Sequence, residues 1–565
     1  MKTLRLIAVA VLMGAAIPTA YGLAPVSRTS TSQYGMVAAA HPLAVEAGLR
    51  MMEKGGNAVD AAAAVAFAVG VAEPFGSGIG GDGIAMIYIA SENKVDAFEY
   101  RCAAPMAATR NTYPESTRSE WTKGGKSFAV PGLIAGTCAF HEQYGQLSLA
   151  EVMQPAIDMA ENGYAVGPAL SKVISDSYDK IAANPEMVKM FLVDEFPPEV
   201  GQRLSNPMLA KTLRLIAENG PEIFYGGPIG EQFVAGTRGQ GSLITLDDLK
   251  AYKARRTEAL SIDYRGMKIY APTMPMGGIG VLLNLNLIER LPLDIAAGAS
   301  SPQNLHLMAE AMKLGSRDRY AVSGDPMFTK IPTEWLLSDE YSDQRAKLVN
   351  PSRALTVAEI PVGPVDQGPG STTHFTIMDA KGNAVSITQT LGGYFGVGVT
   401  APGLGIVLND QMKNFSPSAS SPNALYPGKR MNSTQSPVIV TKDGQSILAM
   451  GSPGNYRITT TVTEVLVNIL DFGLPLQEAL DIPRISALYR DEILEVESGF
   501  SAETLAALAA KGHKVNKHGE MDMFFGGVHA VARDPKTGLL TGAADARRDG
   551  VSKGLAEPPK ATATR

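Results

Sequence analysis

The sequence contains little of what marks several common classes of protein. Two Cys and seven His among 565 residues show no HExxH and no paired Cys/His spacing, so no metal site is indicated. The net charge of -6 is spread along the chain, without the basic face of a nucleic-acid-binding protein or a polybasic membrane patch. No apolar run reaches the roughly 20 residues of a membrane-spanning helix. Its 45% apolar and 19% charged residues instead indicate a soluble globular protein.

The first 22 residues differ from the rest of the chain. Lys2 and Arg5 precede an apolar run over residues 6–17, and small residues occupy the -3 and -1 positions before a cleavage point at Gly22. This pattern is typical of a secretory signal peptide. We therefore expect a periplasmic or secreted protein.

Export would place Cys102 and Cys138 in an oxidising compartment, where they could pair. A domain of this size does not need a disulfide to be stable. We expect two free, buried thiols.

The remaining sequence mixes helical and strand patterns. Residues 38–72 have helical spacing with a break at 55–57, and 150–162 and 302–320 are further helices in a region, 131–350, where helical patterns dominate. Residues 351–370 form a connector with four Pro and three Gly. Strands are predicted at 84–90, 373–379, 383–390, 436–442, 446–451 and 527–534, a helix at 458–470, and disorder at 552–565. These patterns predict a layered α/β or α+β body.

A glycine turn at residues 76–83 matches the spacing of a dinucleotide fingerprint through Gly76, Gly78 and Gly81. That fingerprint requires a helix directly after the turn, so that the helix N-terminus meets the phosphates. Here a strand pattern follows. We interpret the turn as close-packed backbone and reject nucleotide binding.

A second candidate lies where the connector meets a predicted hairpin. If residues 380–382 form the loop, Asp379 faces Asn383, and Thr372 then faces Thr390 with Cβ atoms about 5 Å apart. If the bond before Thr372 were broken, its free amine could serve as the base for its own hydroxyl. Ser and Thr also start many ordinary strands, so the hairpin alone is a weak indication.

A third candidate is the sequence GSPGN at residues 451–455, between a predicted strand and the helix at 458–470. A glycine turn at a helix N-terminus exposes backbone N–H groups that suit an oxyanion. An ordinary strand-to-helix turn explains the pattern equally well.

Many collinear segments resemble the γ-glutamyltransferase (glutathione hydrolase) family over about residues 36–549. They are HPLAVEAGLRMMEKGGNAVDAAAA (41–64), SGIGGDG (77–83), VPGLIAG (130–136), MQPAIDMAENG (153–163), MAEAMKLGSRDRY (308–320), STTHFTIMDAKGNAVSITQT (371–390), LNDQMKNFSP (408–417), PGKRMNSTQSP (427–437) and GSPG (451–454). The resemblance implies the α+β fold of N-terminal-nucleophile hydrolases, a four-layer αββα sandwich. It implies no cofactor and no metal.

The resemblance also implies self-cleavage between Ser371 and Thr372. The signal peptide, residues 1–22, would then precede a large subunit (23–371) and a small subunit (372–565), which form one αββα body as a heterodimer and possibly a larger oligomer. Thr372 is similar to the nucleophile and Thr390 to the threonine that supports it. Gly454 and Asn455 match the pair whose backbone N–H groups form the oxyanion hole, with Asn455 in place of the more familiar Gly.

The substrate-binding residues carried over are Arg101, Gln411, Asn414, Ser433 and Thr434. In the family the arginine holds the α-carboxylate of a γ-glutamyl substrate, a bidentate task that suits guanidinium, and the two hydroxyl residues assist it.

Three positions depart from the family pattern. Gly392 replaces an Asn and Asn414 replaces an Asp, both of which serve the substrate α-amino group; losing a charged partner for that group costs about 1–3 kcal/mol. Cys102 replaces a Glu beside Arg101, which predicts a more loosely held arginine. The short segment between Phe415 and Pro427 predicts an open cleft that admits bulky amides.

Three functions follow as hypotheses. The leading one is hydrolysis and transfer of γ-glutamyl groups from small-molecule amides. The same-fold alternative is an acylase for glutaryl- or cephalosporin-type amides, favoured by Gly392 and Asn414. A secreted binding protein whose Thr372 is never activated is the alternative of another class, and it conflicts with the joint presence of Thr372, Thr390, Arg101 and GSPG.

Overall fold

The computed structural model describes residues 27–113, 121–360, 371–490 and 492–560. The predicted signal peptide therefore lies outside the described residues, as do residues 361–370 of the connector. Among the described residues, none of the helices combines the length and the apolar composition that a membrane crossing requires.

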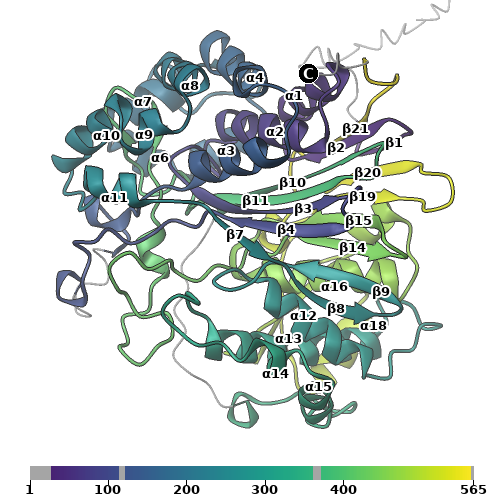
Figure 1. The fold of residues 1–565 in the computed structure, drawn as a ribbon. Helices are drawn as coiled ribbons and strands as arrows, with labels where there is room; N and C mark the ends of the chain where they lie inside the picture. The colour runs from purple at the N-terminus through teal and green to yellow at the C-terminus, as the bar shows by residue number, and fades with distance from the viewer. Residues whose placement is uncertain (1–26, 114–120, 361–370, 491, 561–565) are drawn as a thin grey trace, which may run out of the picture.

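Two seven-stranded sheets lie face to face between two layers of helices (Figure 1), which confirms the four-layer αββα architecture. In order across the first sheet the strands are β21 (Val551–Gly554), β2 (Gly35–Ala39), β10 (Ser371–Asp379), β11 (Ala384–Gly392), β3 (Asp82–Ile89), β4 (Lys94–Glu99) and β7 (Arg255–Glu258). In order across the second they are β1 (Thr29–Ser32), β20 (Leu540–Ala544), β19 (His529–Arg533), β15 (Gln445–Gly451), β14 (Val438–Lys442), β9 (Met267–Ala271) and β8 (Leu260–Tyr264).

The helices divide by sheet. The layer over the first sheet contains α1 (Pro42–Glu53), α2 (Ala58–Ala72), α3 (Leu133–Tyr144), α4 (Leu149–Asn162), α5 (Pro168–Asp176), α6 (Tyr178–Ala182), α7 (Pro185–Phe191), α8 (Pro207–Asn219), α9 (Glu222–Tyr225), α10 (Pro228–Arg238) and α11 (Leu246–Ala251). The layer over the second contains α12 (Gly278–Glu289), α13 (Pro302–Val322), α14 (Thr333–Leu336), α15 (Asp339–Ala346), α16 (Ile458–Leu470), α17 (Leu476–Asp481) and α18 (Ala502–Ala510).

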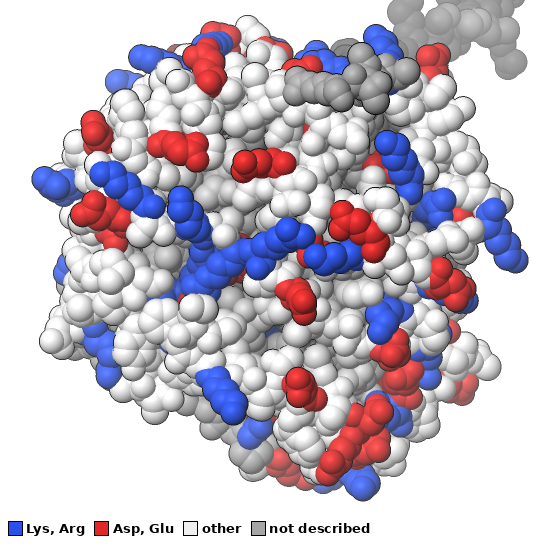
Figure 2. All heavy atoms as spheres, in the orientation of Figure 1, with Lys and Arg blue, Asp and Glu red and all other residues white. Residues whose placement is uncertain are grey.

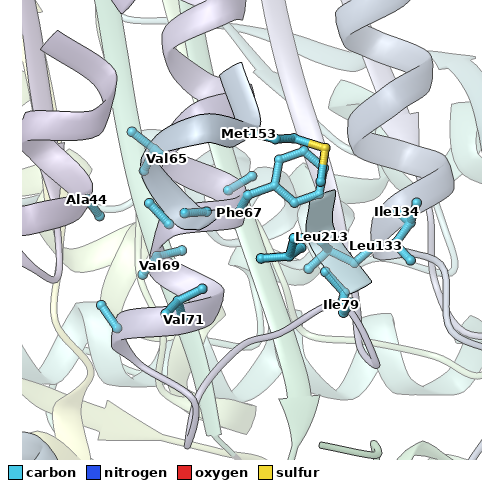
Figure 3. Close-up of a cluster of buried hydrophobic side chains, with 14 of the residues drawn as sticks. Ala44, Val65, Phe67, Val69, Val71, Ile79, Leu133, Ile134, Met153 and Leu213 are labelled. Carbon is cyan, nitrogen blue, oxygen red and sulfur yellow. The ribbon is translucent and has the colours of Figure 1, made fainter. Parts of the chain in front are cut away.

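Helix α2 forms the centre of the upper core because every one of its 15 residues is buried. Its small Ala and Val side chains let it lie close to β10 and β11 on one side and to α1 and α4 on the other. Phe67 fills the larger space beside Met153 of α4 and Leu213 of α8 (Figure 3). Asn57 caps the first turn and forms a capping box with Asp60.

Most predicted elements are confirmed, and two predictions are wrong. Residues 38–39 are not helical: they end β2, which pairs with β10 and β21, and the helix begins only at Pro42. At the other end, residues 552–554 are not disordered, because they continue β21 beside β2. Alanine-rich sequence suits a buried strand as well as a helix when both faces of the sheet are covered.

The region 131–350 is dominated by helices as predicted, but it also contains three strands of the two sheets. β7 is the last strand of the first sheet, and β9 and β8 are the last two strands of the second. The predicted helix at 458–470 is observed with the same limits. Cys102 and Cys138 are free and buried, as expected.

Between the two sheets the apolar layer includes two stacked histidines, His374 of β10 and His529 of β19, whose ring centroids lie 6.4 Å apart. The ring nitrogens of His374 hydrogen-bond to Thr388 at 2.9 Å and Thr376 at 3.0 Å. Gly451 faces this ring so closely that a Cβ there would lie 2.4 Å from its Cε1. The first glycine of the GSPGN turn is therefore required by packing between the sheets.

Buried histidines predict a loss of stability in mild acid. Burial lowers the pKa of His41, the N-cap of α1, to about 4 and that of His529 to about 3. Below pH ~6.5 these histidines are protonated in the unfolded chain but stay neutral in the native protein. The free energy of unfolding therefore falls by about 1.4 kcal/mol per pH unit for each such residue. Urea unfolding between pH 7.5 and 4.5 measures this slope.

His41→Asn keeps a capping oxygen and removes one titrating group. We expect the variant to match the parent near pH 7.5 and to lose stability less steeply below pH 6.5, by about one proton. Equal slopes for the variant and the parent would contradict the assignment of His41 as a neutral cap.

Candidate active site

The predicted hairpin is present, and its register brings Thr372 to Thr390. The loop residues 380–382 end in Gly382 with φ +86°, and Thr373 pairs with Gln389 as the predicted register requires. The register shifts by one residue at the next pair, where Ser371 faces Gly392, so Thr372 lies in a bulge. Its Oγ1 is 3.3 Å from Oγ1 of Thr390, and both side chains are buried.

Both hydroxyls point at the carbonyl group of Ser371. Thr372 Oγ1 donates to this oxygen at 2.7 Å, and Thr390 Oγ1 donates to the same oxygen. The Ser371 hydroxyl is itself held by the carbonyl of Phe75, 2.9 Å away, at the end of α2. The peptide bond between Ser371 and Thr372 is thus fixed with a hydroxyl nucleophile beside its carbonyl group.

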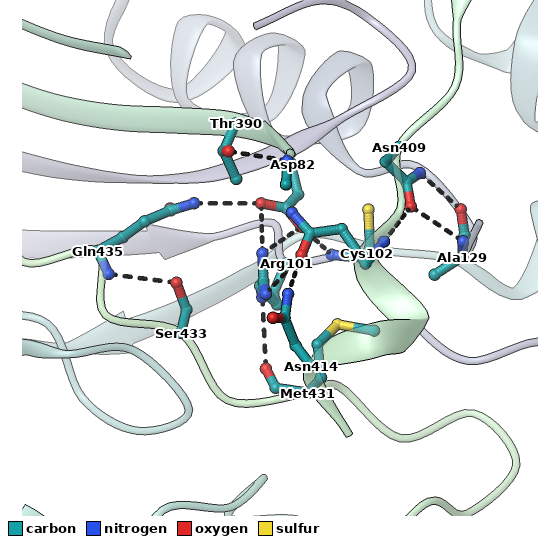
Figure 4. Close-up of polar contacts among 12 residues, drawn as sticks. Asp82, Arg101, Cys102, Ala129, Thr390, Asn409, Asn414, Met431, Ser433 and Gln435 are labelled. Carbon is teal, nitrogen blue, oxygen red and sulfur yellow. Dashed lines mark hydrogen bonds and ion pairs between the residues drawn. The ribbon is translucent and has the colours of Figure 1, made fainter. Parts of the chain in front are cut away.

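Arg101 follows β4 and is enclosed by hydrogen-bond acceptors (Figure 4). Its Nη1 contacts the Asp82 carboxylate at 2.6 Å, and its Nη2 donates to Gln411 Oε1 at 2.8 Å. Arg101 is 2% exposed and Asp82 is fully buried. The prediction that Cys102 leaves the arginine loosely held is wrong, since Asp82 anchors it and also accepts from the backbone N–H of Cys102 at 3.2 Å.

The other predicted binding residues surround one pocket with Arg101 and Thr372. Gln411 and Asn414 belong to a short 3-10 helix, and Asn414 Nδ2 donates to Gln411 Oε1. Thr434 Oγ1 donates to the carbonyl of Asn455 at 2.7 Å. The pocket is lined by Arg101, Arg319, Tyr320, Ser323, Ser371, Thr372, Thr390, Gly392, Gln411, Lys413, Asn414, Phe415, Ser416, Ser421, Asn423, Asn432, Ser433, Thr434, Gln435 and Asn455.

The GSPGN turn reaches this pocket through Asn455. Gly454 has φ +136° and caps the 3-10 turn Asn455–Arg457, which leads into α16 and begins with Asn455 at φ +55°. A left-handed conformation is open to Asn, which explains why Asn replaces Gly here. Gly454 precedes the lining residue; a Cβ there would lie 3.3 Å from the Cα of Gly526, and its φ of +136° would strain any other residue.

The presence of glycine at position 392 also has a structural reason. Its φ is +100°, and a Cβ would lie 2.0 Å from Oδ1 of Asp410. Asp410 is already engaged by the ammonium of Lys413 and the N–H of Gly393, each at 2.8 Å. The side chain that the family carries at this position cannot be added without moving Asp410.

The lining of the pocket contains cations and no anions. Among the described residues that line it, Arg101, Arg319 and Lys413 are cationic and none carries a carboxylate, while Asp82 and Asp410 pair with Arg101 and Lys413 from behind the lining. Figure 2 shows that on one outer face of the molecule basic and acidic side chains are largely interspersed, apart from a short diagonal row of basic ones. The excess of cations in the pocket is thus a local feature.

The segment after Asn414 forms part of the pocket wall. Phe415, Ser416, Ser421 and Asn423 all line the pocket. The segment folds back on itself, with Ser416 N–H donating to the Asn423 carbonyl at 3.0 Å. The open cleft that admits bulky amides stays a prediction.

One group of side chains elsewhere has the composition of a metal site. His306, Glu310 and His513 lie together in the interior beside α13. His306 Nδ1 and His513 Nε2 are 2.8 Å apart, and both Glu310 oxygens accept hydrogen bonds, from Lys313 Nζ and from the Leu355 N–H, at 2.8 Å each. The ammonium of Lys313 would repel a divalent cation at this position. We therefore interpret the group as a hydrogen-bonded anchor for residues 350–355.

Sequence reasoning missed two charged residues at the site. Asp82 ends the glycine turn that was interpreted as backbone only, and an acidic residue in a buried turn was the available signal. Arg548, 176 positions from Thr372, donates from Nη1 to the Thr372 carbonyl at 3.0 Å. No local pattern marks it.

Comparisons with known proteins identify the family of this chain. The sequence model of gamma-glutamyltranspeptidase matches residues 44–555. An acylase ACY 1 proenzyme from Pseudomonas sp. (strain V22) is 37% identical over 94% of this chain and 96% of its own length. A glutathione hydrolase proenzyme from Escherichia coli (strain K12) is 36% identical over 94% of this chain and 93% of its own.

A crystal structure of cephalosporin acylase from Bacillus halodurans superposes with a TM-score of 0.86 at 32% identity, covering 95% of this chain and 98% of that one. The fold built from the two sheets is thus one already seen in a solved structure. The chain belongs to the gamma-glutamyltranspeptidase family of N-terminal-nucleophile hydrolases.

Proposed function

We propose that this protein is a self-processing amidase that forms an acyl-enzyme on Thr372 and acts on amides whose acyl chain ends in a carboxylate, glutaryl amides before γ-glutamyl amides. The observation that carries the proposal is the contact of two hydroxyls, from Thr372 and Thr390, with one backbone carbonyl at the start of β10.

Maturation begins at that carbonyl. The Oγ1 of Thr372 attacks the Ser371 carbonyl carbon, the C–N bond breaks, and the nitrogen keeps its electron pair and takes a proton, which leaves an ester. Water then hydrolyses the ester and frees the Ser371 carboxylate and the Thr372 hydroxyl. The products are a large subunit, 23–371, and a small subunit, 372–565, that stay together in one body. Export follows if the predicted leader is removed after Gly22.

In the mature enzyme the free amine of Thr372 accepts the proton of its own hydroxyl while the oxygen attacks the substrate amide. The backbone N–H groups of Gly454 and Asn455 stabilise the resulting oxyanion. The amine returns the proton to the leaving nitrogen, and water or an amine acceptor then attacks the acyl ester. Thr390 holds the hydroxyl in place throughout.

The charge of the pocket supports the choice of acyl group. A carboxylate at the end of the chain binds Arg101 by displacing the two acceptors of its Nη2, Gln411 Oε1 and the Asn432 carbonyl, while Asp82 keeps Nη1. Ser433 and Thr434 line the pocket beside it. The ammonium of a γ-glutamyl chain meets no carboxylate among the described lining residues, because the nearby Asp410 is already paired with Lys413. A glutaryl chain avoids this penalty because it has no ammonium.

γ-Glutamyl hydrolysis and transfer is the second candidate. Asn414 keeps a side-chain oxygen that can accept from an ammonium, and Gln411 stands beside it. The family likeness includes glutathione hydrolases as well as acylases, at nearly equal identity.

Processing gives the first prediction. On a denaturing gel the purified protein should show two pieces, spanning residues 23–371 and 372–565. Thr372→Ala should remain a single chain because no hydroxyl is left to attack, whereas Thr373→Ser, one residue along the same strand, should process normally. Cleavage of the Thr372→Ala protein at the same bond would refute the proposed nucleophile.

Substrate choice gives the second prediction. We expect kcat/KM for glutaryl p-nitroanilide to exceed that for L-γ-glutamyl p-nitroanilide by about tenfold or more, the equivalent of a charged hydrogen bond of about 1–3 kcal/mol. Asn414→Asp supplies the missing carboxylate and should move the ratio at least about tenfold toward the γ-glutamyl substrate.

Ser416→Asp is the matched control, because it adds the same charge to another part of the pocket lining. A shift as large as that of Asn414→Asp would mean that net charge alone sets the preference. A parent enzyme that prefers the γ-glutamyl anilide would establish the second candidate instead.

A further inference from the structure

Arg548 occupies a narrow space between the candidate nucleophile and the turn that carries Gly454. It follows β20, and its Nη1 donates to the carbonyl oxygen of Thr372 at 3.0 Å. Its side chain crosses Gly527, where a Cβ would lie 2.9 Å from Cγ and Cδ of the arginine. Gly526, the residue before Gly527, lies against Gly454. Only 6% of Arg548 is exposed, so its charge is sheltered from water.

The guanidinium of Arg548 has no carboxylate at ion-pair distance within the described ranges. Its neighbour Arg547 is different, since it pairs with Glu497 and Asp545. Arg548 Nε is buried without a hydrogen-bond partner among the described residues. The hydrogen bond that its side chain makes within the described residues is the one from Nη1 to the Thr372 carbonyl.

Charged and titratable groups face this region from every neighbouring element. They are Glu73 at the end of α2, Asp82 of β3 with Arg101, Lys413, His374 of β10, His529 of β19, and Asp545 and Asp549 around Arg548. Asp82 is neutralised by Arg101, and Asp545 by Arg484 and Arg547. The two histidines are neutral because burial lowers the pKa of each.

Glu73 and Asp549 remain as carboxyls near Arg548. Burial raises the pKa of both, while the charge of Arg548 acts in the opposite direction. Glu73 accepts a hydrogen bond from the Thr373 hydroxyl at 2.5 Å, on the residue after Thr372. Arg548 hydrogen-bonds to Thr372 itself, so it is the charged group that contacts that residue most directly.

We propose that Arg548 is a positioning residue that holds Thr372 by its carbonyl oxygen and keeps the amine freed by processing in its unprotonated form. The inference rests on the proposed function, because that amine exists only after cleavage before Thr372. An ordinary α-amine has a pKa of about 7.7–8.0 and is mostly protonated at neutral pH, where it cannot act as a base. A cation close by disfavours the ammonium form.

The first test uses the processed parent enzyme and needs no variant. Brief acetylation with acetic anhydride across pH 5–10, read by mass spectrometry of the N-terminal peptides, gives the titration midpoint of the Thr372 amine and of the other subunit's amine in one sample. We expect the Thr372 midpoint to lie about one pH unit below the other. Equal midpoints, or a higher one for Thr372, would overturn the proposal.

The second test uses variants and the pH profile of kcat/KM with whichever anilide the enzyme turns over. Arg548→Met removes the charge and should move the acid limb up by about one pH unit, with the rate recovering at high pH. Arg548→Lys keeps a cation that can reach the carbonyl and should restore most of the parent profile. Arg50→Met, on the outer face of α1 with its exposed Asp158 partner, should leave the profile unchanged.

An equal loss of rate at every pH in Arg548→Met and Arg548→Lys, with the acid limb unmoved, would show that Arg548 only supports the backbone. If Arg548→Met fails to process, the acetylation midpoint of the parent and the Arg548→Lys profile still decide the question. A parent protein that never frees the Thr372 amine would instead defeat the proposed function.

Discussion

The site depends on compensating a positive charge that is buried at the end of a sheet. Arg101 and Asp82 are almost fully removed from water, and such a pair survives only when its geometry is good and the remaining donors and acceptors are satisfied. Gln411 and the backbone N–H of Cys102 satisfy them here. Asp82 also pairs with Thr390 in the β3–β11 ladder. One strand register therefore fixes the distance between the Arg101–Asp82 pair and the hydroxyl of Thr390.

Close backbone packing sets the rest of the geometry. Three glycines leave space that a Cβ would fill. The space at Gly451 is taken by the ring of His374, that at Gly527 by the stem of Arg548, and that at Gly392 by Asp410. Each glycine stands where a side chain of the site, or one just behind it, approaches the main chain. The glycines that link strands to turns thus do more than allow positive φ: they let charged and aromatic groups from the two sheets reach one another.

Local sequence predicted what local interactions determine. The loop Ala380–Gly382 fixed the hairpin and placed Thr372 at Thr390, because side-chain alternation and a left-handed glycine specify register within a few residues. The bulge at Thr372 was not predictable, since it arises where Ser371 is tied to Phe75, far away in the chain. Ala38 and Ala39, the last two residues of β2, were misread as helix because alanine carries no strand signal of its own. Asp82 and Arg548 were missed because their partners meet them only in the folded protein.

The acyl pocket shows why two departures from the family pattern, Gly392 and Asn414, belong together. The carboxylate closest to Gly392 is that of Asp410, and it is committed to Lys413 and to the N–H of Gly393. An Asn at position 392 would force Asp410 to move, because its Cβ would lie 2.0 Å from Oδ1, the atom that accepts from the N–H of Gly393. With Gly at 392 and Lys at 413, Asp410 stays behind the pocket wall and the surface that a substrate meets is cationic or neutral. Selection for an ammonium group therefore requires a new carboxylate at the surface, and position 414, which is hydrogen-bonded to Gln411 beside Arg101, is where the present backbone can carry one.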